Sequence, residues 1–252
     1  MIGIFDSGVG GLSVLKEIKR LSPNIDIVYY GDIKNAPYGE KKLTELKKLT
    51  RQSIEILQKK GVKNIFSACN SVSVFMLDFK GKDLKIMEMI GPTVSGVIKV
   101  GRIGNNGTAI FATPATINAG IYQREFLKNG FDIKTFPFPK LAGAIEFGED
   151  LNKVEKIINK NIDGNNFQNI SNIILCCTHY PFVKSIFQKV FDSRNIKINI
   201  IDPSQIVAKK VIEEFGEKGS GKLEFLISKE SENFRNMITE IFKNYDYSIK
   251  VV

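Results

Sequence analysis

The chain has 252 residues, of which 43% are hydrophobic and 25% charged, as expected for a soluble globular protein with one large or two smaller domains. Its 36 basic and 27 acidic residues give a net charge of +9, but the lysines are spread over amphipathic segments without a basic run among aromatics, so no nucleic-acid partner is expected. No signal peptide is evident and no apolar run approaches the roughly 18 residues of a membrane span, so we expect a cytoplasmic protein that does not bind membranes.

A short strand at residues 1–5 is followed by a glycine-rich turn at 6–11 and by a helix at 12–21, where apolar residues recur at helical spacing. The turn contains Asp6 and Ser7 and partly fits a nucleotide-binding fingerprint, in which backbone N–H groups hold a phosphate. A carboxylate inside the turn would stand where that phosphate must sit. A site for an anion or an amino acid is therefore the favoured interpretation. A dinucleotide site, a structural turn and a helix-capping role for Asp6 are the alternatives.

Strands and helices then alternate along the chain, which predicts an α/β fold with parallel sheets. Further strands are expected at residues 25–30, 64–68, 85–89, 131–136, 172–176, 196–201, 223–228 and 246–251, with a strand and loop within 108–116. Further helices are expected at residues 40–60, 72–79, 151–162, 182–191, 205–215 and 230–245. Gly61 is expected to end the first of these helices, and Ser204 to cap the helix that follows it. Gly91-Pro92-Thr93 is expected to open a new segment.

Two apolar runs of the chain end in the same way. Residues 64–71 and 172–179 match by type, with Cys69 standing where Cys177 stands and Asn70 where Thr178 stands. The offset is constant, since 172 − 64 and 177 − 69 are both 108, and the strands that open the two halves are 106 residues apart. Recurrence in the same order predicts a duplicated α/β unit.

We therefore expect an α/β fold of two similar open-sheet domains, related by pseudo-twofold symmetry, with the active site in the cleft between them. The last strands exceed what the second repeat needs and are expected to pack back on the first unit. The first domain would then comprise residues 1–94 and 206–252, and the second residues 95–205. Ligands bind at the carboxyl ends of strands in such sheets, which is where both cysteines stand.

The three cysteines, an odd number, do not make a disulfide framework, so reduced thiols are expected. Cys69 and Cys177 each precede a predicted helix start, where the helix dipole favours a thiolate. Two thiols on opposite walls of a cleft suit inversion at a carbon centre, because one face loses a proton while the other gains one. A thiol hydrolase that uses Cys177 and the only histidine, His179, is an alternative from a different class. A protein that binds an amino acid or a partner without catalysis is another.

Cys176 is expected to be a small core residue, because its position on the strand points it away from Cys177. The same geometry excludes a zinc site built from Cys176, Cys177 and His179, since adjacent residues on a strand face opposite sides of the sheet. No metal is expected.

Five short motifs, in order along nearly the whole chain, resemble those of the cofactor-independent glutamate racemases, within the aspartate/glutamate racemase superfamily. Known members interconvert L- and D-glutamate and supply D-glutamate for peptidoglycan. The resemblance therefore implies this reaction without a cofactor, with aspartate as the alternative substrate. The motifs are Phe5-Asp6-Ser7-Gly8-Val9-Gly10-Gly11-Leu12, Pro37-Tyr38-Gly39, Ala68-Cys69-Asn70, Gly91-Pro92-Thr93 and Cys177-Thr178-His179-Tyr180-Pro181.

The resemblance also implies a role for each matching residue. Cys69 matches the thiol that removes the proton from the D-isomer, and Cys177 the thiol that removes it from the L-isomer. Asp6 and His179 match the groups that assist these thiols, and Glu146 matches a further acidic residue near the second. The residues that match substrate-binding positions are Ser7, Asn70, Ser71 and Thr178 for the α-amino and α-carboxylate groups, Pro37, Tyr38 and Gly39 for the side-chain carboxylate, and Thr113 and Thr116 along the pocket.

The expected partner is thus a small molecule, glutamate, held without lysine or arginine, since neither residue type occurs in the motifs. A carbanion formed in such a site would be stabilised by amides, hydroxyls and the exclusion of water. A homodimer is expected. By resemblance alone, some members of the family also bind DNA gyrase.

Overall fold

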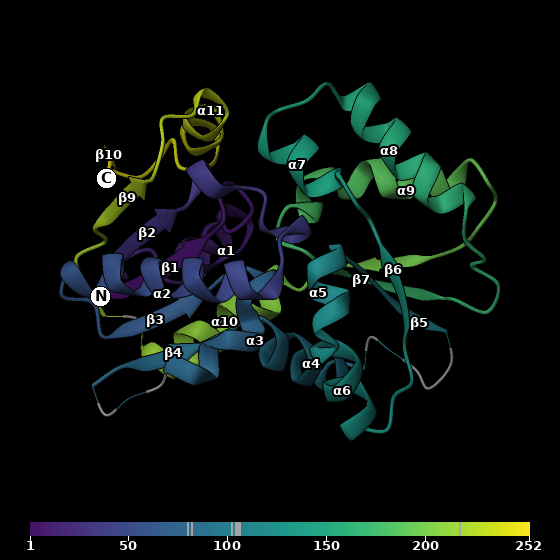
Figure 1. The fold of residues 1–252 in the computed structure, drawn as a ribbon, viewed down its shortest axis with the longest axis horizontal. Helices are drawn as coiled ribbons and strands as arrows, with labels where there is room; N and C mark the ends of the chain where they lie inside the picture. The colour runs from purple at the N-terminus through teal and green to yellow at the C-terminus, as the bar shows by residue number, and fades with distance from the viewer. Residues whose placement is uncertain (80, 82, 102, 104–106, 217) are drawn as a thin grey trace.

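The computed structural model describes residues 1–79, 81, 83–101, 103, 107–216 and 218–252, and in these residues the strands form two parallel sheets (Figure 1). The first sheet has six strands in the order β10-β9-β2-β1-β3-β4, and the second has four in the order β6-β5-β7-β8. The strands are β1 (Ile2–Asp6), β2 (Ile27–Gly31), β3 (Asn64–Ser67), β4 (Lys85–Met87), β5 (Thr108–Ala112), β6 (Lys134–Pro137), β7 (Asn172–Cys176), β8 (Asn199–Ile201), β9 (Leu223–Ile227) and β10 (Tyr247–Val251).

The two sheets repeat one topology. Strand order 2-1-3-4 in the first sheet recurs as 6-5-7-8 in the second, so that β1 corresponds to β5 and β3 to β7. β9 and β10 extend the first sheet beyond β2, and Figure 1 shows these C-terminal strands beside the N-terminal ones. The expected α/β fold with two similar open sheets is confirmed.

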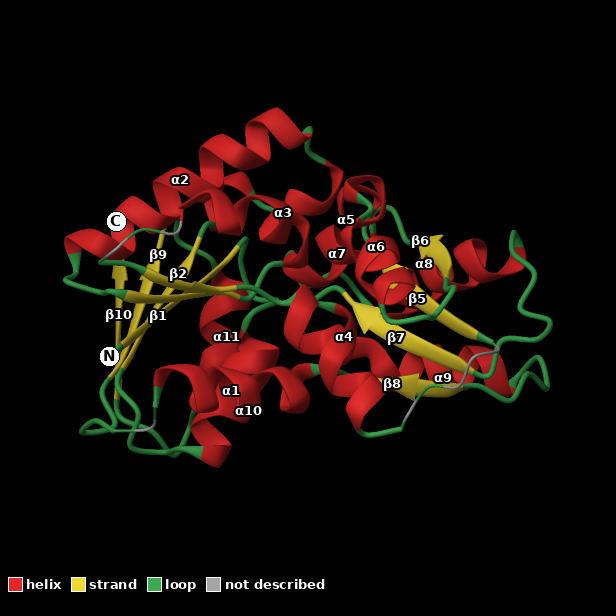
Figure 2. Cartoon of the chain, turned by 90° about the horizontal axis from the view of Figure 1, so that it is seen from below, coloured by secondary structure: helices red, strands yellow, loops and turns green. Residues whose placement is uncertain are grey.

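Helices cover both faces of the first sheet, which Figure 2 shows edge on, with α2 and α3 on one side and α1, α10 and α11 on the other. The helices are α1 (Leu12–Leu21), α2 (Leu43–Lys59), α3 (Ser73–Met76), α4 (Ile90–Lys99), α5 (Pro114–Ala119), α6 (Ile121–Lys128), α7 (Leu141–Glu146), α8 (Leu151–Asp163), α9 (Lys184–Asp192), α10 (Ser204–Phe215) and α11 (Glu232–Ile241). Short 3₁₀ helices lie at Ile33–Asn35, Tyr38–Glu40, Asn70–Val72, Leu77–Phe79 and Tyr180–Val183.

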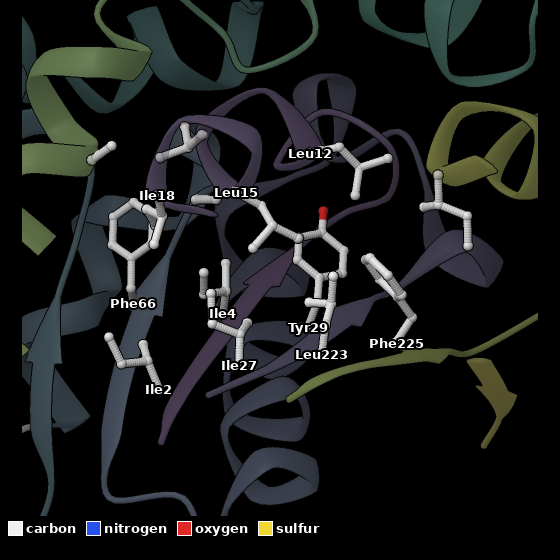
Figure 3. Close-up of a cluster of buried hydrophobic side chains, with 14 of the residues drawn as sticks. Ile2, Ile4, Leu12, Leu15, Ile18, Ile27, Tyr29, Phe66, Leu223 and Phe225 are labelled. Carbon is white, nitrogen blue, oxygen red and sulfur yellow. The ribbon is translucent and has the colours of Figure 1, made fainter. Parts of the chain in front are cut away.

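The central strands are mostly apolar because helices bury both of their faces. Every residue of β1 and β2 is buried. Figure 3 shows Ile4 of β1 among the side chains of the core on the α1 face, together with Leu15 of α1 and Tyr29 of β2. The ring of Tyr29 lies in this core while its hydroxyl donates a hydrogen bond to the Gly8 carbonyl, 2.6 Å away. The core thus reaches and holds the glycine-rich turn.

Some local predictions were wrong. Gly91-Pro92-Thr93 lies in the first turn of α4, where proline is tolerated because the N–H it lacks has no partner within the helix. Ser204 does not cap α10; its own N–H is instead accepted by the Asp202 carboxylate at 2.8 Å. The helices α4, α5, α6 and α7 were not predicted. The domain boundaries at 94/95 and 205/206 fall inside α4 and α10, and this division of the chain stays a prediction.

Candidate active site

A pocket lies where the residues that follow β1, β3, β5 and β7 come together, between the two sheets. Little free space remains within it, about the room of a single water molecule, so the side chains around it lie close together. Among the described residues, its lining contains no lysine or arginine. The lining residues are Ser7, Pro37, Tyr38, Gly39, Cys69, Asn70, Ser71, Thr113, Ala142, Cys177, Thr178 and His179.

The two sheets deliver one thiol each to this pocket. Cys69 follows β3 and Cys177 follows β7, at corresponding places in the repeated topology, and both are buried. Cys176 belongs to the core on the opposite face of the second sheet, with Ile174 and Ile201, whereas Cys177 packs on the other face. The expectation that Cys176 is a core residue agrees with this arrangement.

His179 links Cys177 to a buried carboxylate. Its Nδ1 lies 3.8 Å from the Cys177 Sγ, and its Nε2 lies 2.7 Å from Oε2 of Glu146, which is fully buried at the end of α7. Burial alone would lower the pKa of His179, but the hydrogen bonds to Cys177 and Glu146 outweigh burial and raise that pKa well above its usual value. The site therefore favours an imidazolium with its two N–H groups directed to the thiol and the carboxylate.

The glycine-rich turn is shaped by this pair rather than by a phosphate. The Val9 N–H donates to Oε2 of Glu146 at 2.9 Å. A Cβ on Gly8 would overlap the Glu146 carboxylate, and a Cβ on Gly10 would lie 2.5 Å from Nδ1 of His179. The glycines are thus required by the close approach of Glu146, at the end of α7, and of His179, which follows β7. These contacts occupy the place that a phosphate would need, so they argue against a dinucleotide site.

Asp6, at the end of β1, is fully buried behind the lining residues. One of its oxygens accepts the Gly8 N–H at 3.0 Å, and the other accepts the Thr178 hydroxyl at 3.1 Å. Burial raises the pKa of Asp6, and the nearby His179 opposes that rise. Asp6 does not cap α1, whose N-cap is Gly11 without a side-chain hydrogen bond. It holds a residue of the second unit instead.

Hydroxyl groups from both halves meet on the wall of the pocket near Cys69. The Ser71 Oγ lies 3.1 Å from Thr113 Oγ1 and 3.3 Å from Thr116 Oγ1, and the two threonine oxygens are 3.0 Å apart. Beside them, Asn70 Oδ1 accepts a hydrogen bond from the Tyr122 hydroxyl at 2.6 Å. The Asn70 Nδ2 is buried without a partner among the described residues. These groups form a polar wall with an unused N–H donor.

No histidine stands beside Cys69, since the single histidine of the chain, His179, is next to Cys177. Burial raises the pKa of Cys69 well above its usual value, and the negative charge of Asp6 adds to that rise, while the Ser71 and Val72 N–H groups oppose it. The structure therefore favours a neutral thiol at Cys69, and the two thiols differ in their electrostatic surroundings.

Of the predicted site residues, Asp6, Glu146 and Thr116 stand just behind the lining, each hydrogen-bonded to a residue of the pocket wall. Sequence reasoning missed Ala142 and Tyr122. Ala142 carries no functional group and stands one residue into α7, so the sequence offers no signal for it. Tyr122 carries no such signal either, because it reaches Asn70 only through the packing of α6.

Within the described part of the chain, no cluster of histidine, cysteine, aspartate or glutamate side chains has the arrangement of a metal site. Across that same part, no helix has the length and apolarity that crossing a membrane requires.

Comparison with known proteins places these features in a family. No family model matches the chain. The glutamate racemase of Clostridium botulinum is 41% identical, over 80% of this chain and 78% of that protein, and the glutamate racemase of Aquifex pyrophilus is 34% identical, over 99% and 96%. The crystal structure of Francisella tularensis glutamate racemase in complex with D-glutamate matches with a TM-score of 0.82 and 29% identity, over 100% of this chain and 96% of that one. The resemblance found in the motifs is confirmed, and the chain belongs to the glutamate racemase family.

Proposed function

We propose that the protein interconverts L- and D-glutamate without a cofactor, by proton transfer between the substrate Cα and two thiols, Cys69 and Cys177. The observation that carries this proposal is that the two thiols stand at corresponding ends of β3 and β7 and line one small pocket. One thiolate removes the α-proton and the opposite thiol donates a proton to the other face. The product leaves the two thiols with exchanged protonation states, ready for the reverse reaction.

Cys177 is proposed to act as the base for L-glutamate, with His179 beside it. The imidazolium of His179 lies next to the sulfur, and Glu146 holds that cation in place through Nε2. In this role His179 does not act as the general base, as it would in a hydrolase. It assists Cys177, which itself serves as the base and the acid. The thiolate removes the proton of the L-isomer, in line with the family resemblance.

The side of Cys69 is suited to begin as a thiol, because burial and Asp6 disfavour its negative charge. A neutral thiol is the acid that the reaction of L-glutamate needs on the opposite face. For D-glutamate the two roles are reversed, and the Ser71 and Val72 N–H groups then stabilise the Cys69 thiolate.

The pocket offers distinct surroundings for the charged groups of the substrate. We assign the α-carboxylate to the wall of hydroxyls at Ser71 and Thr113 and to the free Asn70 N–H donor. We assign the α-ammonium group to Ser7 and Thr178, close to the negative charge of Asp6. Neutral donors around the carboxylate suit the carbanion, whose charge spreads onto the carboxylate oxygens as the α-proton leaves.

The side-chain carboxylate of glutamate is assigned to the turn at Pro37, Tyr38 and Gly39, which lies on the pocket wall. The Tyr38 hydroxyl is already engaged, donating to Asp32 Oδ2 at 2.5 Å, so the backbone N–H groups of the turn are the donors proposed for this carboxylate. We propose that the distance between this turn and the two thiols favours glutamate over the shorter aspartate. The product D-glutamate is proposed to serve peptidoglycan synthesis.

Incubation with L-glutamate in D₂O tests the proposal directly. We expect D-glutamate with deuterium at Cα, detected by NMR and chiral chromatography, and much slower exchange with aspartate. Cys69→Ser and Cys177→Ser are each expected to lower racemisation by about 10³-fold or more, because each removes one of the two proton-transfer groups. Cys176→Ser is the matched control and is expected to remain active. Near-normal racemisation by Cys69→Ser would favour a single-thiol reaction such as hydrolysis through Cys177 and His179.

A further inference from the structure

Tyr122 is a buried tyrosine outside the pocket lining whose hydroxyl touches the polar wall. It belongs to α6 of the second unit, is fully buried, and stacks on Phe126 with ring centroids 6.4 Å apart. Its ring lies in a core with Ile90 of α4 and Cys176 of β7. Packing on these sides fixes the ring, and with it the position of the hydroxyl.

The hydroxyl of Tyr122 decides which way the Asn70 amide faces. It donates to Asn70 Oδ1 at 2.6 Å, so the oxygen end of the amide faces Tyr122 and the Nδ2 end is left for a ligand of the pocket that Asn70 lines. That Nδ2 is buried without a partner in the described residues. Burial raises the pKa of Tyr122 well above its usual value, so the hydroxyl keeps its proton at any pH at which the enzyme works.

A second hydrogen bond that joins the two units in the same way supports a functional role for Tyr122. Asn70 and Thr178 occupy corresponding positions, each directly after a proposed catalytic cysteine. Thr178 of the second unit is held by Asp6 of the first, at 3.1 Å. Asn70 of the first unit is held by Tyr122 of the second, at 2.6 Å. Each unit thus orients the polar residue beside the other unit's thiol.

We propose that Tyr122 is a positioning residue for racemisation: it locks the Asn70 amide with its N–H donor toward the substrate α-carboxylate. This inference rests on the proposed function and extends it to a residue outside the pocket lining. Without the hydroxyl, Oδ1 of Asn70 loses its buried partner and the amide is free to turn. An amide that presents its oxygen to a carboxylate repels the substrate instead of binding it.

Tyr122→Phe removes only the hydroxyl and keeps the packed ring. We expect kcat/KM to fall by about tenfold or more for both glutamate enantiomers, while the lost buried hydrogen bond lowers the thermal unfolding midpoint by no more than a few degrees. Asn70→Ala is expected to fall further, and the double variant Tyr122→Phe/Asn70→Ala is expected to equal Asn70→Ala. A purely structural role would give an additional loss in the double variant, because the packing defect would not depend on Asn70.

Two further variants complete the test. Phe126→Leu disturbs the same core without touching Asn70, and it is expected to lower the unfolding midpoint while leaving kcat/KM near the wild-type value. Asn70→Asp retains an acceptor for Tyr122 but has no N–H donor, and it is expected to lose glutamate binding.

The outcomes separate this inference from the proposed function. Absence of Cα exchange by the wild-type protein would remove the proposed function itself. Racemisation by the wild type, together with normal kcat/KM for Tyr122→Phe or additive losses in the double variant, would overturn the role of Tyr122 alone. Normal or tighter glutamate binding by Asn70→Asp would overturn the proposed amide orientation.

Discussion

Replacing Glu146 by glutamine tests the charge arrangement of the site while preserving its shape. The Glu146 Oε2 accepts two hydrogen bonds, from Nε2 of His179 at 2.7 Å and from the Val9 N–H at 2.9 Å. A glutamine carbonyl can accept both, so the geometry of the turn is retained. What is lost is the negative charge that holds His179 as a cation against the cost of its burial.

The size of the effect follows from that loss. A hydrogen bond to a charged group contributes about 1 to 2 kcal/mol more than a neutral one, and about 1.36 kcal/mol corresponds to a tenfold change. We therefore expect kcat/KM of Glu146→Gln to fall by about 5- to 30-fold at neutral pH. The two enantiomers must show the same loss, because their interconversion has an equilibrium constant of one at every pH. Separate values of kcat and KM remain free to differ.

The assay is the initial rate in each direction, followed by circular dichroism over a range of pH. Glu149→Gln is the matched control, because Glu149 lies on the same segment and pairs with Lys153 on the surface. It is expected to leave kcat/KM unchanged. Full activity of Glu146→Gln would refute the view that the charge of Glu146 maintains the imidazolium beside Cys177.

Stability gives an independent check with a defined sign. A pKa of His179 raised above about 6.5 stabilises the folded protein below that pH, and this contribution is lost as the pH rises through the raised value. The difference in unfolding free energy between wild type and Glu146→Gln is therefore expected to be larger near pH 6 than near pH 9. Denaturant titrations at both pH values measure it.

Two further substitutions probe the glycine-rich turn and its carboxylate. Gly8→Ala is expected to destabilise the fold by about 1 to 3 kcal/mol and to lower activity, because the new Cβ displaces Glu146. Thermal unfolding measures the loss of stability, and kcat/KM measures the loss of activity. Gly164→Ala, in open surroundings, is the control. Asp6→Asn is expected to lose racemisation but to keep its stability at pH 7. The pKa of Asp6 is raised in the folded protein, so its buried charge destabilises the fold. This destabilisation is absent below pH 3.8 and complete above the raised pKa. A large drop in unfolding free energy for Asp6→Asn at pH 7 would contradict that sign.

The sequence predicts the parts of the fold that depend on local pattern. The strands β3 and β7 each begin with an asparagine, continue with buried, mostly apolar residues and are followed by a cysteine and a polar residue, so both their existence and their correspondence are visible in the chain. The helices α5 and α7 have only six residues each, too few to show an amphipathic repeat. They are stabilised by packing against the surrounding core, and the local sequence pattern does not predict that packing.

The residues of the site also differ in how far the sequence alone predicts them. The repeat alone predicts Cys69 and Cys177 as site residues. Glu146 was reached only through the resemblance, because its contact with His179 spans 33 residues and depends on how α7 packs. Tyr122 lies 52 residues from Asn70 and on the other unit, so only the tertiary structure brings the two together.

The return of β9 to the first sheet has a consequence for how the protein is made. β9 pairs with β2, an apolar strand of sequence IVYYG, and it is synthesised only after the whole second sheet. Until then β2 is an open edge with unpaired backbone groups, of the kind that templates aggregation. Chains that stop before residue 223 leave this edge uncovered, so loss of the C-terminal strands endangers solubility even though it removes no residue of the pocket.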